Sequence, residues 1–152
     1  MDKTQNPRMV QQKGNSMNPI LYILMRTDMT SLNAGKAMAQ ASHATNAFIQ
    51  EAARVDDEEI RELVETWSTQ TWQGFGTVLV LGCNETEMNE AVDYSRRDSE
   101  YHCRPFLEGV VHDPTYPVRD GEITHYVPVD TCAFIFGDKN EIDFLDGLDL
   151  HD

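Results

Sequence analysis

Three polar side chains near the start of the chain are spaced to share one face of a helix. Lys36, Gln40 and His43 stand at i, i+4 and i+7, and such positions lie on the same side of an α-helix. A lysine in the first turn adds its charge to the positive potential of the unpaired backbone N–H groups. This combination binds phosphates and stabilises developing negative charge. The spacing indicates a functional site. Three plainer interpretations stay open on the residues alone: a solvated lysine, a histidine bonded to a core carbonyl and a glutamine bridging helix and loop.

The helix that carries these side chains follows an apolar run over residues 20–25. The run is too short to cross a membrane and is rich in β-branched and aromatic residues, so it predicts a strand buried on both faces and ending at Arg26. Chemistry in α/β proteins lies beside the ends of such strands. A helix over residues 33–53 would place the polar stripe there.

Two more helices and a strand are predicted in the middle of the chain. The acidic residues 56–59 suit a helix amino terminus. The apolar repeat of that second helix consists of Ile60, Leu63, Val64 and Trp67. Residues 77–81 predict a second buried strand. Asn84 and Glu87 predict a capping box that starts a third helix, which should stop near residues 96–97.

The last third of the chain predicts two strands and a short helix. Strands over residues 106–111 and 131–136 flank residues 114–130, where three prolines and Gly121 predict a long excursion rather than a simple hairpin. A short helix is predicted around residues 142–145. The order β-α-α-β-α-β-β-α predicts an α/β fold, with a small four-stranded mixed sheet and helices on both faces.

The charge of the chain restricts its partners. The 152 residues include 12 Lys and Arg against 26 Asp and Glu, a net charge of −14. Such a charge repels polyanions at long range, which excludes indiscriminate nucleic-acid binding but leaves room for one local basic patch. The candidates for that patch are Arg26, Lys36, Arg96, Arg97, Arg104 and Arg119.

The domain organisation and compartment follow from composition. Residues 1–17 are polar and lack apolar periodicity, so they predict a disordered amino-terminal tail ahead of a single domain over residues 18–152. We expect no signal peptide and no membrane span. Cys83, Cys103 and Cys132 are an odd number without CxxC spacing, which predicts free thiols in the cytoplasm.

The first third of the chain resembles the signature of the type 2 peptidyl-tRNA hydrolase family. The order of elements also matches, as do Trp72 and Gly74 ahead of the second strand, so the resemblance covers about residues 20–145. The segments that carry it are Arg26-Thr27-Asp28, Gly35-Lys36, Ala39-Gln40 and Ser42-His43-Ala44.

The resemblance implies hydrolysis of the ester that joins a peptide to the terminal ribose of tRNA, a task in translation and ribosome rescue. It implies an α/β domain that forms a homodimer, and we expect no cofactor and no metal. The catalytic residues it implies are Lys36, Asp113, Thr124 and Thr131. The predicted substrate contacts are Arg26, Asp28, Gln40, His43, Arg96, Arg97 and Arg104.

Each implied catalytic residue has a role in ester hydrolysis, which needs an activated water and a stabilised oxyanion. Lys36 would stabilise the oxyanion or bind the terminal phosphate. Asp113 would orient or deprotonate the water, or hold the lysine, although an aspartate before a proline also suits a plain turn. The two threonine hydroxyls would position water or ribose. Because the loop after Asp113 is longer than in the family, Thr115 competes with Thr124 for one of these places.

Two other functions remain open at this stage. The family turn usually carries a second lysine, where this chain has Ala34. A relative that keeps the fold without turnover, acting as a binding or regulatory module, is one alternative, and a hydrolase of a smaller acyl substrate is another. The neighbouring pairs His102-Cys103 and His112-Asp113 lack the spacing of a closed metal site.

Overall fold

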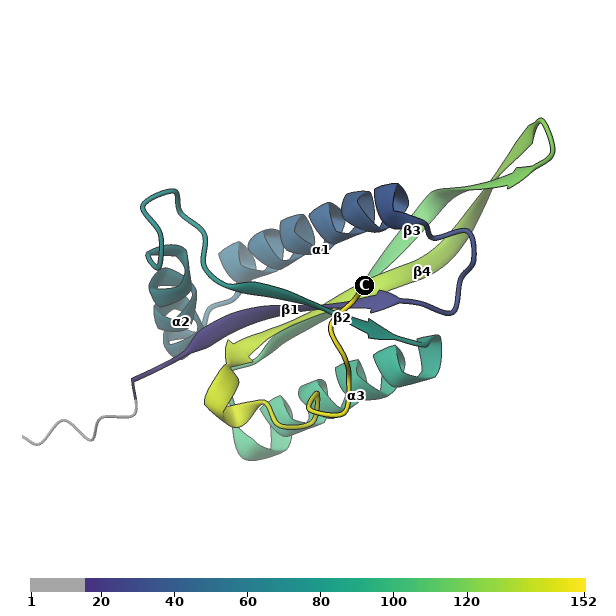
Figure 1. Cartoon of the computed structure of the whole chain (residues 1–152). Coiled ribbons are helices and arrows are strands. Elements are labelled where there is room, and N and C mark those ends of the chain that lie inside the picture. Colours follow the sequence, from purple (N-terminus) through teal and green to yellow (C-terminus); the bar gives the residue numbers. More distant parts are fainter. Residues whose placement is uncertain (1–15) are drawn as a thin grey trace, which may run out of the picture.

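The computed structural model describes residues 16–152, which form one four-stranded sheet with helices on both faces (Figure 1). The strands are β1 (Pro19–Arg26), β2 (Val78–Cys83), β3 (Leu107–Asp120) and β4 (Ile123–Asp138). The helices are α1 (Ala34–Arg54), α2 (Glu58–Ser68), α3 (Glu85–His102) and a 3₁₀ turn, η1 (Lys139–Glu141). This order confirms the predicted fold class. Residues 1–15, most of the predicted disordered tail, lie outside the described residues.

The sheet has the strand order β2-β1-β4-β3. Strand β1 is parallel to β2 and antiparallel to β4, and β4 is antiparallel to β3. All eight residues of β1 are buried, as its apolar run predicts. Alternate β1 side chains enter two separate cores, since successive side chains of a strand point to opposite faces. Leu21 and Ile23 belong to the core under α1 and α2, whereas Tyr22 and Leu24 belong to the core under α3.

Side-chain caps mark where each of the three α-helices begins. Asn33 accepts a hydrogen bond from the backbone N–H of Lys36, and Asp57 accepts one from Ile60. Asn84 and Glu87 form the predicted capping box. These caps satisfy N–H groups that have no partner within the helix, so the amino terminus of α1 and its lysine are held in a defined place.

Residues 114–130 are a hairpin, so the predicted loop excursion is wrong. Strands β3 and β4 remain paired as far as Asp120 and Ile123, across two register shifts, and the turn places Gly121 at a φ of +61°. This two-stranded ribbon projects beyond the rest of the sheet (Figure 1). Pro114 and Pro128 fall where the register of the two strands is irregular. Prolines are tolerated at such places because they remove no regular ladder bond.

Three smaller predictions are also corrected. Helix α3 runs on to His102 and ends at Cys103, whose φ is +52°. Strand β2 is the outermost of the four strands and is buried only towards its end, where the carboxyl-terminal segment bridges its free side at Leu81 and Leu150. The last helix is the single turn η1, ahead of the predicted position. No helix within residues 16–152 is long and apolar enough to span a membrane.

The three cysteines should differ sharply in reactivity. Burial raises the pKa of Cys83 to about 12 and that of Cys132 to about 11, whereas Cys103 is exposed. Because the thiolate is the reactive form, we expect iodoacetamide to alkylate Cys103 alone in the native protein at pH 8, and all three thiols in urea. Mass spectrometry of the peptides measures this. Rapid native labelling of Cys83 or Cys132 would contradict it.

Candidate active site

The polar face of helix α1 that carries Lys36 and Gln40 packs against the base of the β3–β4 ribbon. Gln40 Nε2 donates to Asp113 Oδ2 at 2.7 Å, and Thr131 Oγ1 donates to Gln40 Oε1 at 2.7 Å. One turn earlier on α1, Lys36 Nζ donates to the carbonyl of Pro117 at 2.7 Å. Residues from the first and the last third of the domain therefore meet along one helix face.

A β-bulge turns Thr131 towards α1. Val111 pairs with Cys132 and His112 pairs with Asp130, so Thr131 is an extra residue in β4. Bulges of this kind change the direction in which a side chain points. Cys132 also contacts α1, with its Sγ 3.4 Å from the Gln40 carbonyl oxygen that accepts its hydrogen bond. Strict alternation would have put Thr131 on the α3 face, away from Gln40.

The environment of Asp113 keeps it ionised. Burial alone would raise the pKa of Asp113, but hydrogen bonds from the backbone N–H of Thr115 and from Gln40, together with the nearby charge of His43, outweigh burial and lower the pKa. The Thr115 N–H lies 2.9 Å from Asp113 Oδ1. His43 itself is exposed at the rim of this cluster. A carboxylate stabilised in this way stays charged at neutral pH and is only a weak base.

The lowered pKa predicts a titration that depends on Gln40. In the folded protein Asp113 should titrate below the ordinary aspartate value of about 3.9. Its contribution to stability is present above that value and is lost as the pH falls through the folded-state pKa. We expect Gln40→Leu to move the pKa upward and the control Gln50→Leu, on the exposed side of α1, to leave it unchanged. Carbon-13 NMR of the Asp113 carboxyl measures both, and a wild-type midpoint above 4 would contradict the prediction.

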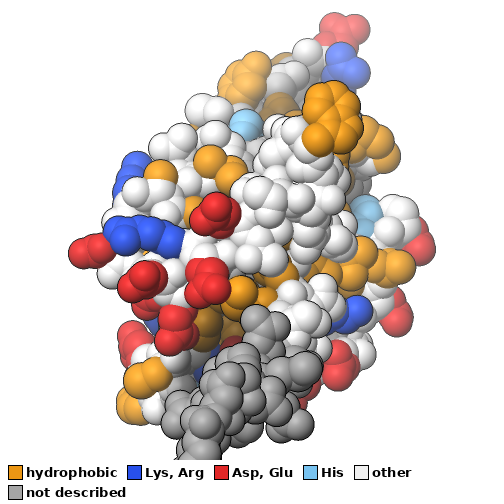
Figure 2. Space-filling model, turned by 90° about the vertical axis from the view of Figure 1, so that its left-hand side faces the viewer, with side chains coloured by type: hydrophobic (Ala, Val, Ile, Leu, Met, Phe, Trp, Pro, Cys, Tyr) orange, Lys and Arg blue, Asp and Glu red, His pale blue; other side chains and the backbone are white. Residues whose placement is uncertain are grey.

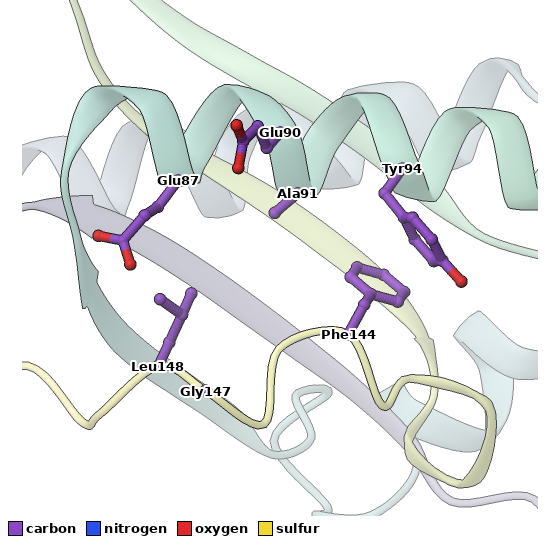
Figure 3. Close-up of a pocket in the computed structure, with 7 residues that line it drawn as sticks. All are labelled: Glu87, Glu90, Ala91, Tyr94, Phe144, Gly147 and Leu148. Carbon is purple, nitrogen blue, oxygen red and sulfur yellow. The ribbon is translucent and has the colours of Figure 1, made fainter.

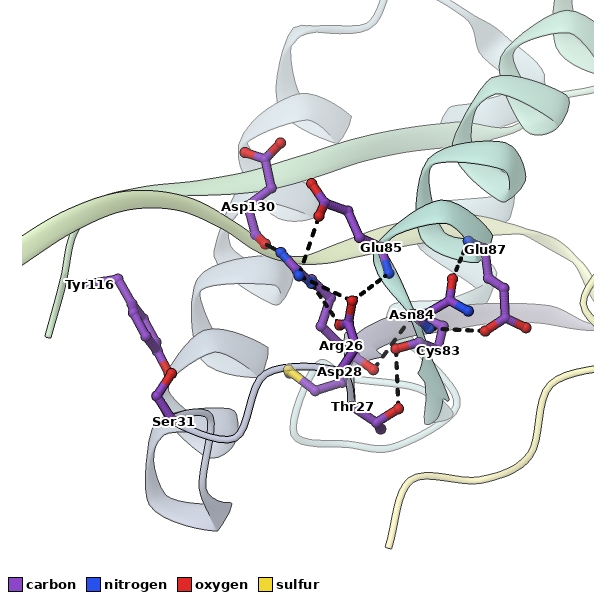
Figure 4. A network of polar contacts seen from close by, with 11 residues as sticks. Arg26, Thr27, Asp28, Ser31, Cys83, Asn84, Glu85, Glu87, Tyr116 and Asp130 are labelled. Carbon is purple, nitrogen blue, oxygen red and sulfur yellow. Dashed lines mark hydrogen bonds and ion pairs between the residues drawn. The ribbon is translucent and has the colours of Figure 1, made fainter. Parts of the chain in front are cut away.

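Arg26 and Asp28 are not part of this cluster. They belong to a polar network that connects the end of β1 to β4 and to the start of α3 (Figure 4). Arg26 Nε donates to Asp28 Oδ1 at 2.9 Å, and its Nη1 donates to the carbonyl of Asp130 at 3.0 Å. Its Nη2 lies 3.3 Å from a carboxylate oxygen of Glu85 at the start of α3. The hydrogen bond from Arg26 lowers the pKa of Asp28. Since Arg26 is only 8% exposed, these contacts favour a structural role.

The other candidate arginines do not join Lys36. Arg96 Nε lies 3.5 Å from a carboxylate oxygen of Glu108, and Arg104 Nε lies 3.6 Å from one of Asp98. Both belong to the α3 side of the sheet, whereas Lys36 lies on the α1 side. Arg97 is exposed on α3 and Arg119 is exposed near the ribbon tip. On the part of the face in Figure 2 that residues 16–152 form, basic side chains lie among acidic ones.

The structure separates the two candidate threonines. Thr124 is exposed and pairs with Arg119 near the tip of the ribbon. Thr115 lies beside Asp113, with its Oγ1 3.5 Å from Asp113 Oδ1. The geometry therefore brings Thr115 to the cluster and places Thr124 away from it.

A hollow on the opposite side of the sheet has the wrong charge for a polyanion. It has a volume of about 320 Å³ and lies between α3 and the carboxyl-terminal segment (Figure 3). Glu87 and Glu90 line it together with the rings of Tyr94 and Phe144, whose centroids are 4.7 Å apart. Two carboxylates at its rim would repel a phosphate.

Sequence reasoning missed Tyr116 and Ser31 at this site. Tyr116 is fully buried at the base of the ribbon, and its hydroxyl donates to Ser31 Oγ at 3.2 Å. Lys36 Nζ lies 5.1 Å from the centroid of the Tyr116 ring. No local pattern indicates these contacts, because residues 31 and 116 meet only through the packing of α1 on the ribbon.

Comparison with known proteins identifies the family. A family model described as Peptidyl-tRNA hydrolase PTH2 matches residues 20–102. This chain belongs to that family. The family is one of hydrolases, and the match spans β1 to α3, including Lys36, Gln40 and His43. Asp113 and Thr131 lie beyond the matched residues, and what connects them to this segment is their hydrogen bonding with Gln40. No curated protein matches the chain significantly.

Proposed function

We propose that this chain hydrolyses the ester bond of peptidyl-tRNA and releases free tRNA and the peptide. The observation that carries the proposal is the convergence of Lys36, Gln40, Asp113 and Thr131 on one face of α1. This face combines a cation at a helix amino terminus with an ionised carboxylate. Membership of the hydrolase family supports the reaction class.

In the proposed reaction Asp113 orients the attacking water. Its lowered pKa favours this role over that of a strong base, since a carboxylate of low pKa holds a proton weakly. Thr131 acts through Gln40: its hydroxyl donates to Gln40 Oε1, which leaves Gln40 Nε2 to donate to Asp113. Thr115, rather than Thr124, supplies a hydroxyl beside the carboxylate, with its Oγ1 3.5 Å from Asp113 Oδ1.

Lys36 supplies the positive charge. It stabilises the developing oxyanion or binds the terminal phosphate of the tRNA, aided by the amino terminus of α1. A net charge of −14, and a site to which residues 16–152 contribute one lysine, favour a short contact with the single-stranded end of tRNA. Each phosphate contact with a single strand contributes a slope of about −0.7 to log K against log salt, so binding should depend only weakly on salt. In this proposal Arg26 and Asp28 have a structural role, because they hold the ends of β1, β4 and α3 together.

The decisive experiment uses the wild-type chain and tRNA carrying an N-blocked aminoacyl group. Catalytic amounts of protein should release free tRNA over many turnovers, measured by separating charged from uncharged tRNA on acid gels. Two outcomes discriminate the alternatives. Binding of the tRNA without any cleavage would favour a regulatory module, to which Ala34 also points, and cleavage of short acyl esters alone would favour a smaller substrate.

The remaining features of the proposal concern organisation. We propose that residues 18–152 form a single domain of the peptidyl-tRNA hydrolase type and that it works in the cytoplasm, in keeping with its three free cysteines. The homodimer implied by the resemblance stays a prediction, and sedimentation equilibrium measures it.

A further inference from the structure

We propose that Tyr116 is a positioning residue that holds the Lys36 ammonium at the base of the ribbon without neutralising its charge. This inference rests on the proposed function, in which the charge of Lys36 meets the oxyanion or phosphate. Tyr116 acts through Lys36 and touches no reacting atom.

Two neutral groups hold the ammonium. The face of the Tyr116 ring attracts it from a centroid distance of 5.1 Å, and the Pro117 carbonyl accepts its hydrogen bond at 2.7 Å. Cation–π attraction strengthens when the cation is desolvated, and Lys36 is half-buried. Among the ion pairs of residues 16–152, none joins Lys36 to a carboxylate. The positive charge therefore remains available to an anionic substrate.

The Tyr116 ring is held in place by burial and by a hydrogen bond. Its side chain has no exposed surface, and its hydroxyl donates to Ser31 Oγ in the turn before α1 at 3.2 Å. This bond joins the ribbon to the chain segment that starts the Lys36 helix. A ring held in this way limits where the ammonium can lie, which matters because small displacements of a charged group weaken transition-state stabilisation.

The register shift in the ribbon makes the Tyr116 side chain point towards α1. Asp113 pairs with Val129 and Tyr116 with Val127, so three steps along β3 correspond to two along β4. In a regular strand, residues three apart point to opposite faces. The extra residue puts Tyr116 on the same face as Asp113, where both contact α1. The irregularity thus places the carboxylate and the support of the lysine side by side along one helix.

Turnover tests whether the ring acts through Lys36. We expect Tyr116→Leu to lower kcat/KM about tenfold, the size of effect that a desolvated cation–π contact supplies. The loss falls on kcat where Lys36 stabilises the oxyanion and on KM where it binds the phosphate. Tyr116→Phe, which keeps the ring, should retain activity within about threefold. In a Lys36→Ala background, Tyr116→Leu should have no further effect. Equal losses in the Leu and Phe variants, or full additivity with Lys36→Ala, would overturn the proposal.

Chemical labelling tests the same contact without activity. We expect acetic anhydride to acylate Lys36 about fivefold faster, relative to the exposed Lys139 of the same molecule, once Tyr116→Leu removes the ring.

If that variant does not fold, Ser31→Ala and Tyr116→Phe test the same contact, because each removes one partner of the hydrogen bond between Tyr116 and Ser31. Each should raise the ratio, and the double variant should match the single ones. An unchanged ratio in the folded variants would contradict the proposal. If the labelling changes as expected but the wild-type protein does not cleave tRNA, the contact between Tyr116 and Lys36 stands and the proposed hydrolase function is rejected.

Discussion

Lys36→Ala and Asp113→Asn should each reduce kcat/KM for peptidyl-tRNA by about 10²- to 10³-fold, the usual loss for a charge-stabilising or water-positioning group. Lys36→Ala removes the one lysine that residues 16–152 bring to the site, while the backbone N–H of residue 36 still bonds the Asn33 cap. Asp113→Asn keeps the shape of the side chain but removes its charge, so it cannot hold a water by two charged oxygens.

The design separates chemistry from folding. Lys139→Ala, at an exposed lysine outside the site, is the matched control and should keep wild-type turnover. Lys36→Arg keeps the charge and should recover part of the activity. Circular dichroism verifies the fold of each variant. Undiminished turnover in Lys36→Ala would remove this lysine from the mechanism, and undiminished turnover in Asp113→Asn would remove the carboxylate.

Phe48→Ala should cost about 3–5 kcal/mol of unfolding free energy, a typical loss for a fully buried aromatic side chain. Phe48 has no exposed surface, and its ring lies 4.6 Å from that of Phe136 and 5.4 Å from that of Trp67, between ring centroids. The variant leaves a cavity where α1, α2 and β4 meet. Its destabilisation combines lost burial with lost aromatic contacts.

Urea unfolding measures this cost. The matched control is Ile49→Ala on the same helix, because Ile49 is 43% exposed, and it should change stability by less than about 1 kcal/mol. Similar losses in the two variants would mean that α1 is not anchored through Phe48. Since α1 carries Lys36 and Gln40, weaker packing of α1 in Phe48→Ala should also reduce its turnover at temperatures where the variant is still folded.

The predictions that held depend on local patterns. The apolar run of β1, the acidic start of α2 and the capping box at Asn84 are properties of short segments, so sequence alone indicates them. The ribbon was missed because prolines normally interrupt strands. Here two of the three fall in a register irregularity, which follows from the pairing of β3 with β4.

The sequence by itself determined the fold class and the stripe on α1 that carries the family signature. Tertiary structure decided which residues meet that stripe. Two register shifts turn Thr131 and Tyr116 towards α1, and the length of the ribbon takes Thr124 away from Asp113. The physical reason is that the face on which a strand residue lies depends on its register with a distant partner, and one extra residue reverses it.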